Sequence, residues 1–162
     1  MRHRAWLITA ILVVTGCASN PLDTSGVDNP ATPAQAVGAM PGQQGTRVQW
    51  GGEIVEVTNH DDATLIEVLS YPLGRDGLPN IYRKPTGRFV LRRAGFLEPQ
   101  DYAPGRLLTA VGTIRALTRT TVGQTQLVIP LLSAEQLKLW RDRYQDSPRS
   151  RFGFGVGISI GL

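Results

Sequence analysis

The chain has 162 residues, a mass of 17.6 kDa and a formal net charge of +4, with 41% apolar and 19% charged residues. That composition supports a packed core and excludes a wholly disordered chain. A single cysteine excludes an intrachain disulfide and a cysteine-based zinc site, and two histidines argue against the common histidine-dependent catalytic and metal chemistries.

The N-terminal segment has the pattern of a bacterial export signal. Arg2 and Arg4 precede a ten-residue run, 5–14, in which only Thr9 is polar. That length suits the hydrophobic part of a signal peptide and is about half of what a membrane-spanning helix needs. The run ends in Val14-Thr15-Gly16-Cys17, which looks like a lipobox: an aliphatic residue, two small residues and a cysteine.

We therefore predict that residues 1–16 are a lipoprotein signal peptide and that Cys17 becomes an N-acyl diacylglyceryl cysteine. Residue 18 is Ala rather than Asp, which by resemblance to the lipoprotein sorting rule favours the outer membrane of a Gram-negative cell. An ordinary secretory signal and an uncleaved transmembrane helix are the alternatives. Removing two arginines with the signal leaves 15 basic against 13 acidic residues, and a net charge of +2 predicts no nucleic-acid partner.

Residues 17–45 are predicted to be a lipidated, flexible tether. They carry two charges and no aromatic residue, and a coil of this length spans roughly 30 Å. One short helix is predicted within it, at 33–39, because Thr32 is a good N-cap, Pro33 suits the first helical position and Gln35 completes a capping box. Such a helix could lay Val37 and Met40 on the body.

Period-two patterns predict an all-β body over 46–146. The expected strands are 47–58, 64–71, 87–92, 106–117 and 124–132, with a long loop at 72–87 and one helical turn at 99–102. Within the first strand, Gly51-Gly52 is predicted to form a bulge that changes which residues face inward. Five short strands in this order are typical of a small OB-type barrel; a β-sandwich is the competing architecture.

The C-terminal end is predicted to contain a short amphipathic helix and a glycine-rich tail. Ser133 and Gln136 fit a capping box, and Leu137, Trp140 and Tyr144 follow at helical spacing. An interfacial membrane helix is the alternative. Within the tail, residues 147–162, alternate positions of the segment 152–162 are apolar and small, which fits an edge strand, a membrane-dipping or self-associating strand, or a disordered segment.

Several segments together resemble the Slp family of outer-membrane lipoproteins. The resemblance covers about residues 46–140 and is carried by Arg47-Val-Gln-Trp-Gly-Gly-Glu-Ile54, Thr64-Leu-Ile-Glu-Val-Leu69, Tyr71-Pro-Leu73, Gly77-Leu-Pro79, Gly87-Arg-Phe89, Gly95-Phe-Leu-Glu-Pro99 and Leu108-Thr-Ala-Val-Gly-Thr-Ile114. It implies an outer-membrane location and a link to starvation or stationary-phase envelope states. It implies no catalytic or ligand-binding residue.

The strongest chemical signal is a basic stretch at 75–93, which contains six basic residues and one acidic residue. Arg83, Lys84, Arg88 and Arg92 are the candidate anion-binding residues, because arginine pairs well with phosphate and carboxylate. Lipid head groups, lipopolysaccharide phosphates and peptidoglycan carboxylates are the candidate anions in an envelope. A solvated basic loop is the simpler interpretation.

No catalytic residue, metal site or cofactor is predicted. His60-Asp61-Asp62 is interpreted as a turn between strands, and the acid pairs Glu53/Glu56 and Glu98/Asp101 are interpreted as surface charges. The leading hypothesis is a non-enzymatic structural or interaction module anchored in the outer membrane, with an envelope glycan, lipid or protein as partner. The alternative is a binding module for an anionic envelope glycan or lipid through the 72–93 loop. A hydrolase is the third and weakest hypothesis.

Overall fold

A computed structural model describes residues 19–27 and 31–141. Its elements are α1 (Pro33–Gly38), β1 (Arg47–Asn59), β2 (Ala63–Ser70), β3 (Gly87–Ala94), β4 (Leu107–Val122) and β5 (Thr125–Leu139). The predicted signal peptide, Cys17 and the glycine-rich tail at 147–162 lie outside the described residues. No helix in the described ranges is long and apolar enough to span a bilayer.

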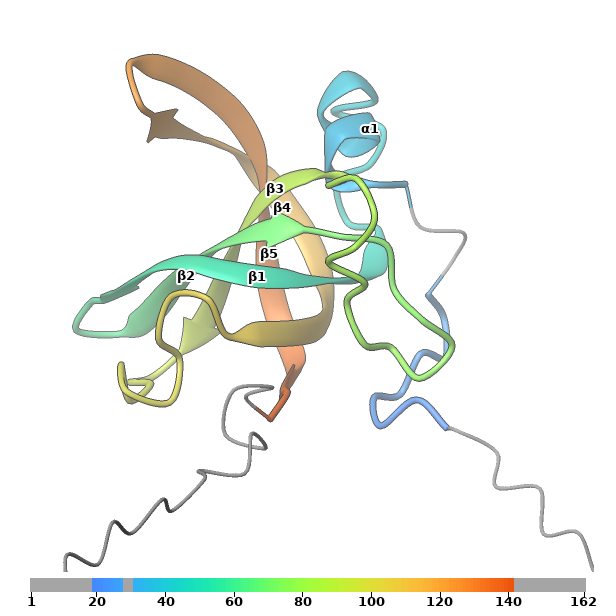
Figure 1. Cartoon of the computed structure of the whole chain (residues 1–162). Helices are drawn as coiled ribbons and strands as arrows, with labels where there is room; N and C mark the ends of the chain where they lie inside the picture. Colours follow the sequence, from blue (N-terminus) through green and yellow to red (C-terminus); the bar gives the residue numbers. More distant parts are fainter. Residues whose placement is uncertain (1–18, 28–30, 142–162) are drawn as a thin grey trace, which may run out of the picture.

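The five strands form one sheet that closes on itself in the order β1-β2-β3-β5-β4 (Figure 1). Neighbouring strands are antiparallel except β3 and β5, which are parallel. The prediction of a mainly β body is confirmed. The first three strands start and end within two residues of their predicted positions, because alternation and turn residues define them locally.

The core lies inside the closed sheet and is filled by alternate residues of every strand. Trp50 and Phe89 pack with their ring centroids 5.4 Å apart, and Phe89 is fully buried. The other fully or almost fully buried members of this cluster are Ala36, Val48, Ile54, Ile66, Val68, Leu91, Leu108, Ala110, Ile114 and Leu132. Burial of this much apolar side-chain surface is the main driving force for the fold.

The bulge predicted at Gly51-Gly52 is displaced. In the β1–β2 pairing the register shifts between Ile54 and Glu56, so Val55 is the extra residue. Inward-facing positions change parity there: Ile54 is buried, Val55 is exposed and Val57 packs against the core. The alternation of apolar residues in the sequence signals that a bulge exists, but the pairing with β2 decides where it lies.

The two glycines have a different role, which is close backbone approach. A Cβ atom on Gly52 would lie 1.9 Å from the carbonyl oxygen of Leu69, and one on Gly51 would lie 2.7 Å from that of Leu108. Neighbouring strands therefore approach β1 from both sides at this point. No other residue type fits without moving backbone.

The predicted C-terminal helix is wrong. Residues 133–139 continue β5, whose residues pair with β4 as far as Leu108 with Leu139. Ser133 also pairs with Arg92 of β3. The capping-box pattern is a local preference worth about 1 kcal/mol, and two neighbouring strand edges offer this segment backbone hydrogen bonds that a helix could not provide to the sheet. Tyr144, the last residue of the predicted helix, lies outside the described residues.

The helical turn predicted at 99–102 is also not a helix. The amides of Asp101 and Tyr102 both donate to the carbonyl of Glu98, which closes a turn only. By contrast, the predicted helix near residue 33 is present. Thr32 and Gln35 form its capping box, and Ala36 is completely buried in the core.

Strands β4 and β5 extend beyond the closed sheet as a long hairpin. They remain paired from Leu117 with Pro130 to Val122 with Thr125 (Figure 1). Strand β4 continues to Val122, beyond its predicted end at residue 117. We call this two-stranded hairpin, residues 115–131, the arm. Its outer end has exposed residues on both strands, including Val122 and Val128.

Candidate functional site

The chain N-terminal to the helix is bound to the outside of the barrel. Residues 19–27 form what we call the strap. The side-chain amide of Asn20 donates to Gln49 Oε1 at 3.1 Å, and the backbone amide of Asp23 donates to Gln136 Oε1 at 3.0 Å. Gln49, Val111 and Gln136 are register partners on β1, β4 and β5, so the strap crosses the outer face of these three strands.

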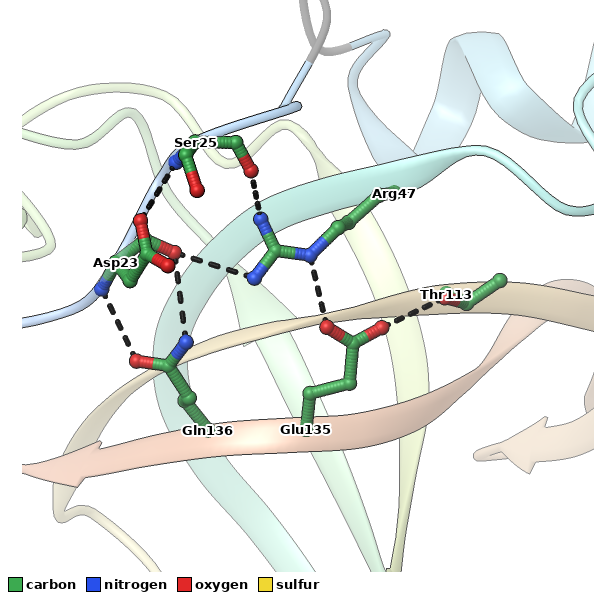
Figure 2. Close-up of polar contacts among 6 residues, drawn as sticks. All are labelled: Asp23, Ser25, Arg47, Thr113, Glu135 and Gln136. Carbon is green, nitrogen blue, oxygen red and sulfur yellow. Dashed lines mark hydrogen bonds and ion pairs between the residues drawn. The ribbon is translucent and has the colours of Figure 1, made fainter.

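Arg47 connects the strap to the barrel (Figure 2). Its Nε lies 2.8 Å from Glu135 Oε2, and its terminal nitrogens donate to the backbone carbonyls of Ser25 and Asp23, the latter at 3.3 Å. Thr113 donates to the other oxygen of Glu135 at 2.8 Å. The guanidinium of Arg47 thus joins β1, β5 and the strap. Its five N–H donors allow one side chain to bind several acceptors at once.

A bulge in β5 positions Glu135 for this contact. Val111 pairs with Gln136 and Gly112 with Ala134, which leaves Glu135 as the extra residue. Bulges commonly redirect one side chain, and here the carboxylate turns toward Arg47. Gly112 makes the close strand approach possible, because a Cβ atom on it would lie 2.2 Å from the carbonyl oxygen of Ser133.

The two acids of this cluster are both held in their ionised form. Hydrogen bonds from Arg47 and Thr113 lower the pKa of Glu135 below its ordinary value of 4.5. Hydrogen bonds from Ser25 lower the pKa of Asp23 below 3.8, with a smaller contribution from the charge of Arg47. Both carboxylates are exposed, so solvent screening keeps the contribution of each shift to stability small.

A cavity of about 650 Å³ lies between the strap, the start of α1 and the loop after β2. Trp50 forms part of its wall, and its indole nitrogen donates to the carbonyl of Ala31 at 2.8 Å. The other lining residues are Asn20, Thr24, Val27, Thr32, Pro33, Gln49, Ser70, Tyr71, Pro72, Leu73, Gly74, Arg75 and Thr86. Gln49 Nε2 is buried and has no hydrogen-bond partner in the described part of the chain.

The four predicted anion-binding residues do not form one cluster of available cations. Arg88 Nη1 lies 2.6 Å from Glu67, and Arg92 Nη2 lies 2.6 Å from Asp62. Antiparallel pairing of β2 with β3 brings these acids alongside, which counting charges within 75–93 could not reveal. Arg83 and Lys84 are exposed in the loop 71–86, and no ion pair to either is found among the described residues.

The tip of this loop is fastened between the strap and the barrel. Gly77 has a φ of +81°, and a Cβ atom on it would lie 2.9 Å from Asn20 Oδ1. Its carbonyl accepts a hydrogen bond from buried Thr109 at 2.7 Å, and Thr109 in turn accepts one from the indole of Trp140 at 2.9 Å. Strap and loop therefore share one fixed face of the molecule.

A second hollow, of about 400 Å³, lies between the β2–β3 face and the hairpin arm. Glu67 is central to it: one carboxylate oxygen pairs with Arg88, and the other accepts a hydrogen bond from Thr120 of the arm at 2.6 Å. Its lining residues are Glu56, Thr58, Leu65, Glu67, Val90, Arg92, Thr118, Arg119, Thr120 and Leu131. The described residues contain no group of three or more metal-ligating side chains.

The residues that fasten the strap were not predicted, because their partners are far apart in the sequence. Asp23 and Gln136, for example, are 113 residues apart. One local signal was available: Leu22 is the only large aliphatic residue between positions 18 and 26, and only 9% of its surface is exposed. The predicted tether over 17–45 therefore does not describe residues 19–27 and 31–45, which make defined contacts with the body.

The chain is similar to one family and to several curated proteins. The family described as the outer membrane lipoprotein Slp family matches residues 14–155. The lipoprotein YeaY of Escherichia coli is 28% identical over 82% of this chain and 69% of its own length. The outer membrane protein Slp of the same organism is 30% identical over 71% of this chain and 62% of its own length. A Haemophilus influenzae protein is 30% identical over 57% of this chain and 51% of its own length.

Proposed function

The chain belongs to the outer membrane lipoprotein Slp family, and we propose that it is a non-enzymatic structural or interaction module of the bacterial envelope, anchored through acylated Cys17. Membership makes it an outer-membrane lipoprotein of a Gram-negative cell. The family match begins at residue 14, so it includes Val14-Thr15-Gly16-Cys17. That coincidence of a lipobox with the start of the match is the observation that carries the proposal.

The chemistry of the proposed anchor follows from the cysteine. Its sulfur would take a diacylglyceryl group, and after cleavage its new amino group would take a third acyl chain. Each buried methylene adds about 0.8 kcal/mol of membrane affinity, so three chains would hold the protein almost permanently.

We also propose that the barrel is of the OB type. The strand order β1-β2-β3-β5-β4 and the parallel pairing of β3 with β5 support this, as does a hollow on the β2–β3 face beneath the β4–β5 hairpin. OB-type barrels bind their ligands on that face. Fold analogy alone does not give a ligand.

A non-enzymatic role is supported by the structural contacts of two glutamates of the barrel. Glu67 and Glu135 are bound to arginine and threonine side chains that join elements of the fold. A link to starvation or stress is a further part of the proposal, drawn from the Slp resemblance.

A second candidate function is binding of an anionic envelope glycan or lipid. In the form that the structure favours, it uses the loop cations Arg83 and Lys84, since Arg88 and Arg92 are paired with acids. The exposure of the two loop cations is the observation behind it.

The anchor is tested by replacing Cys17→Ser in the full chain and growing cells with labelled palmitate. We expect no label in the protein, accumulation of uncleaved precursor and loss from the outer-membrane fraction. Ser19→Ala, which leaves the cysteine in place, should label and fractionate like the parent. Undiminished labelling of the Cys17→Ser protein would contradict the proposal.

A further inference from the structure

The strap limits how far the barrel can stand from its lipid anchor. Asn20 is hydrogen-bonded to Gln49 on β1, and Leu22 is buried. Positions 17 and 20 are three Cα-to-Cα steps apart, and an extended chain spans at most about 3.6 Å per step. An anchor at Cys17 therefore lies within about 11 Å of Asn20. A free coil from 18 to 45 would have allowed roughly 30 Å.

The loop 71–86 lies on the same face of the barrel as Asn20, where the strap is attached. Gly77 at the tip of the loop is packed against Asn20, and Arg75 lines the same cavity as Asn20. Figure 1 shows the loop, in light green, beside the blue strap. The hairpin arm lies on the other side of the barrel in this view. A short attachment thus brings the loop, and not the arm, close to the bilayer.

The exposed side chains of the loop suit a lipid head-group region. Arg75, Arg83 and Lys84 are exposed cations, and Tyr82 is 85% exposed. The single acid within 71–86 is Asp76, whose Oδ1 accepts a hydrogen bond from the backbone of Leu78 and is thereby held in the turn. Cations near an anionic membrane surface and aromatic residues at the interface are the usual elements of such a contact.

We propose that the loop 71–86 is a second membrane contact, which docks on the phosphates of phospholipid head groups in the leaflet that carries the acyl anchor. The inference rests on the proposed acylation of Cys17, because the short chain between anchor and strap brings the loop to the surface. The barrel is then a module with one fixed side toward the lipid and its hairpin arm directed away. The anchor holds the protein on the membrane, and the loop sets its orientation.

The orientation is tested with tryptophan as a depth probe in the acylated full chain. Tyr82→Trp keeps an aromatic residue in the loop, and Val122→Trp places the same probe at the exposed end of the arm. Both proteins are reconstituted into phosphatidylethanolamine–phosphatidylglycerol vesicles containing lipids brominated near the head group. We expect added quenching, relative to the parent, for Tyr82→Trp only. Equal quenching of the two probes would overturn the proposal.

The charge requirement is tested in the Tyr82→Trp background. Arg83→Gln and Lys84→Gln are combined, and the matched control combines Arg115→Gln and Arg119→Gln, which removes two exposed charges elsewhere. The docking equilibrium should weaken about fivefold for each loop charge removed, and the control should dock like the parent. Vesicles of phosphatidylcholine alone should mimic the loop variant. Unchanged quenching of the loop variant would refute the role of the cations.

Flotation with the vesicles separates this inference from the proposed function. A protein that does not float lacks the anchor, so the acylation proposal fails. A protein that floats but shows no added Tyr82→Trp quenching is anchored without the loop contact, so only the orientation proposal fails. Matching urea unfolding midpoints for all variants exclude misfolding as the cause.

Discussion

Arg47 on β1 and Glu135 on β5 are 88 residues apart in the sequence, and their Nε and Oε2 atoms lie 2.8 Å apart in the folded chain. The pair does more than join two strands, because the same guanidinium also binds the backbone of Ser25 and Asp23 (Figure 2). The position of strap residues 23–25 on the barrel therefore depends on this arginine.

Replacing Arg47→Met should release the strap without unfolding the barrel. The change removes two hydrogen bonds to strap carbonyls and one half-exposed ion pair, and we expect a loss of about 1–2 kcal/mol in the free energy of unfolding. Hydrogen exchange at the amides of Asp23 and Ser25 should accelerate much more than exchange in β2. Arg119→Met, on the arm, is the control and should leave strap exchange unchanged.

Acid should loosen the strap before it unfolds the barrel. The folded-state pKa values of Glu135 and Asp23 both lie below their ordinary values of 4.5 and 3.8. Their ionised forms therefore stabilise the strap fully above those ordinary values, and the stabilisation is lost as the pH falls through the lowered pKa values. Strap-amide exchange, corrected for its intrinsic pH dependence, should rise on acidification. Glu135→Gln should remove part of this pH dependence. Strap-amide exchange with the same pH profile in this variant as in the parent would contradict a role for the Glu135 carboxylate.

Local sequence pattern predicted most of the barrel because alternation and turn residues act within a few positions. Glycine positions and apolar parity indicated that β1 must change face, and the capping box at Thr32 indicated α1. The pattern failed where a distant partner decided the outcome. Residues 133–139 have a helix start signal, yet the segment pairs with β4, and its first residue, Ser133, also pairs with β3.

The candidate site was predicted less well than the fold, for the same physical reason. The basic stretch was visible, but the acids that pair with Arg88 and Arg92 come from β2 and from the turn before it. Likewise, a polar, proline-containing segment such as 19–27 has the composition of a flexible tether. Its position is set by hydrogen bonds to Gln49 on β1, to Gln136 on β5 and from Arg47, which composition does not encode.

Gly52→Ala should be severely destabilising. The added Cβ atom would lie 1.9 Å from the carbonyl oxygen of Leu69, so two paired strands would have to separate. We expect a loss of about 3 kcal/mol or more, or failure to fold. Gly38→Ala is the matched control, because nothing lies within 4 Å of its Cβ position and it closes α1. That variant should be neutral or more stable by up to about 1 kcal/mol, as shown by urea unfolding.

Thr120→Val should free the hairpin arm from the barrel while keeping the side-chain shape. Thr120 Oγ1 donates to Glu67 at 2.6 Å, and a hydrogen bond to a charged group contributes about 1.5–3 kcal/mol to stability. Glu67 keeps Arg88, and the arm is partly open to solvent, so the lower end of that range is expected. Thr121→Val, at the neighbouring exposed position, is the control. Backbone relaxation measurements should show faster motion at residues 118–127 only for Thr120→Val; an arm equally rigid in both variants would mean that the β4–β5 ladder alone fixes its position.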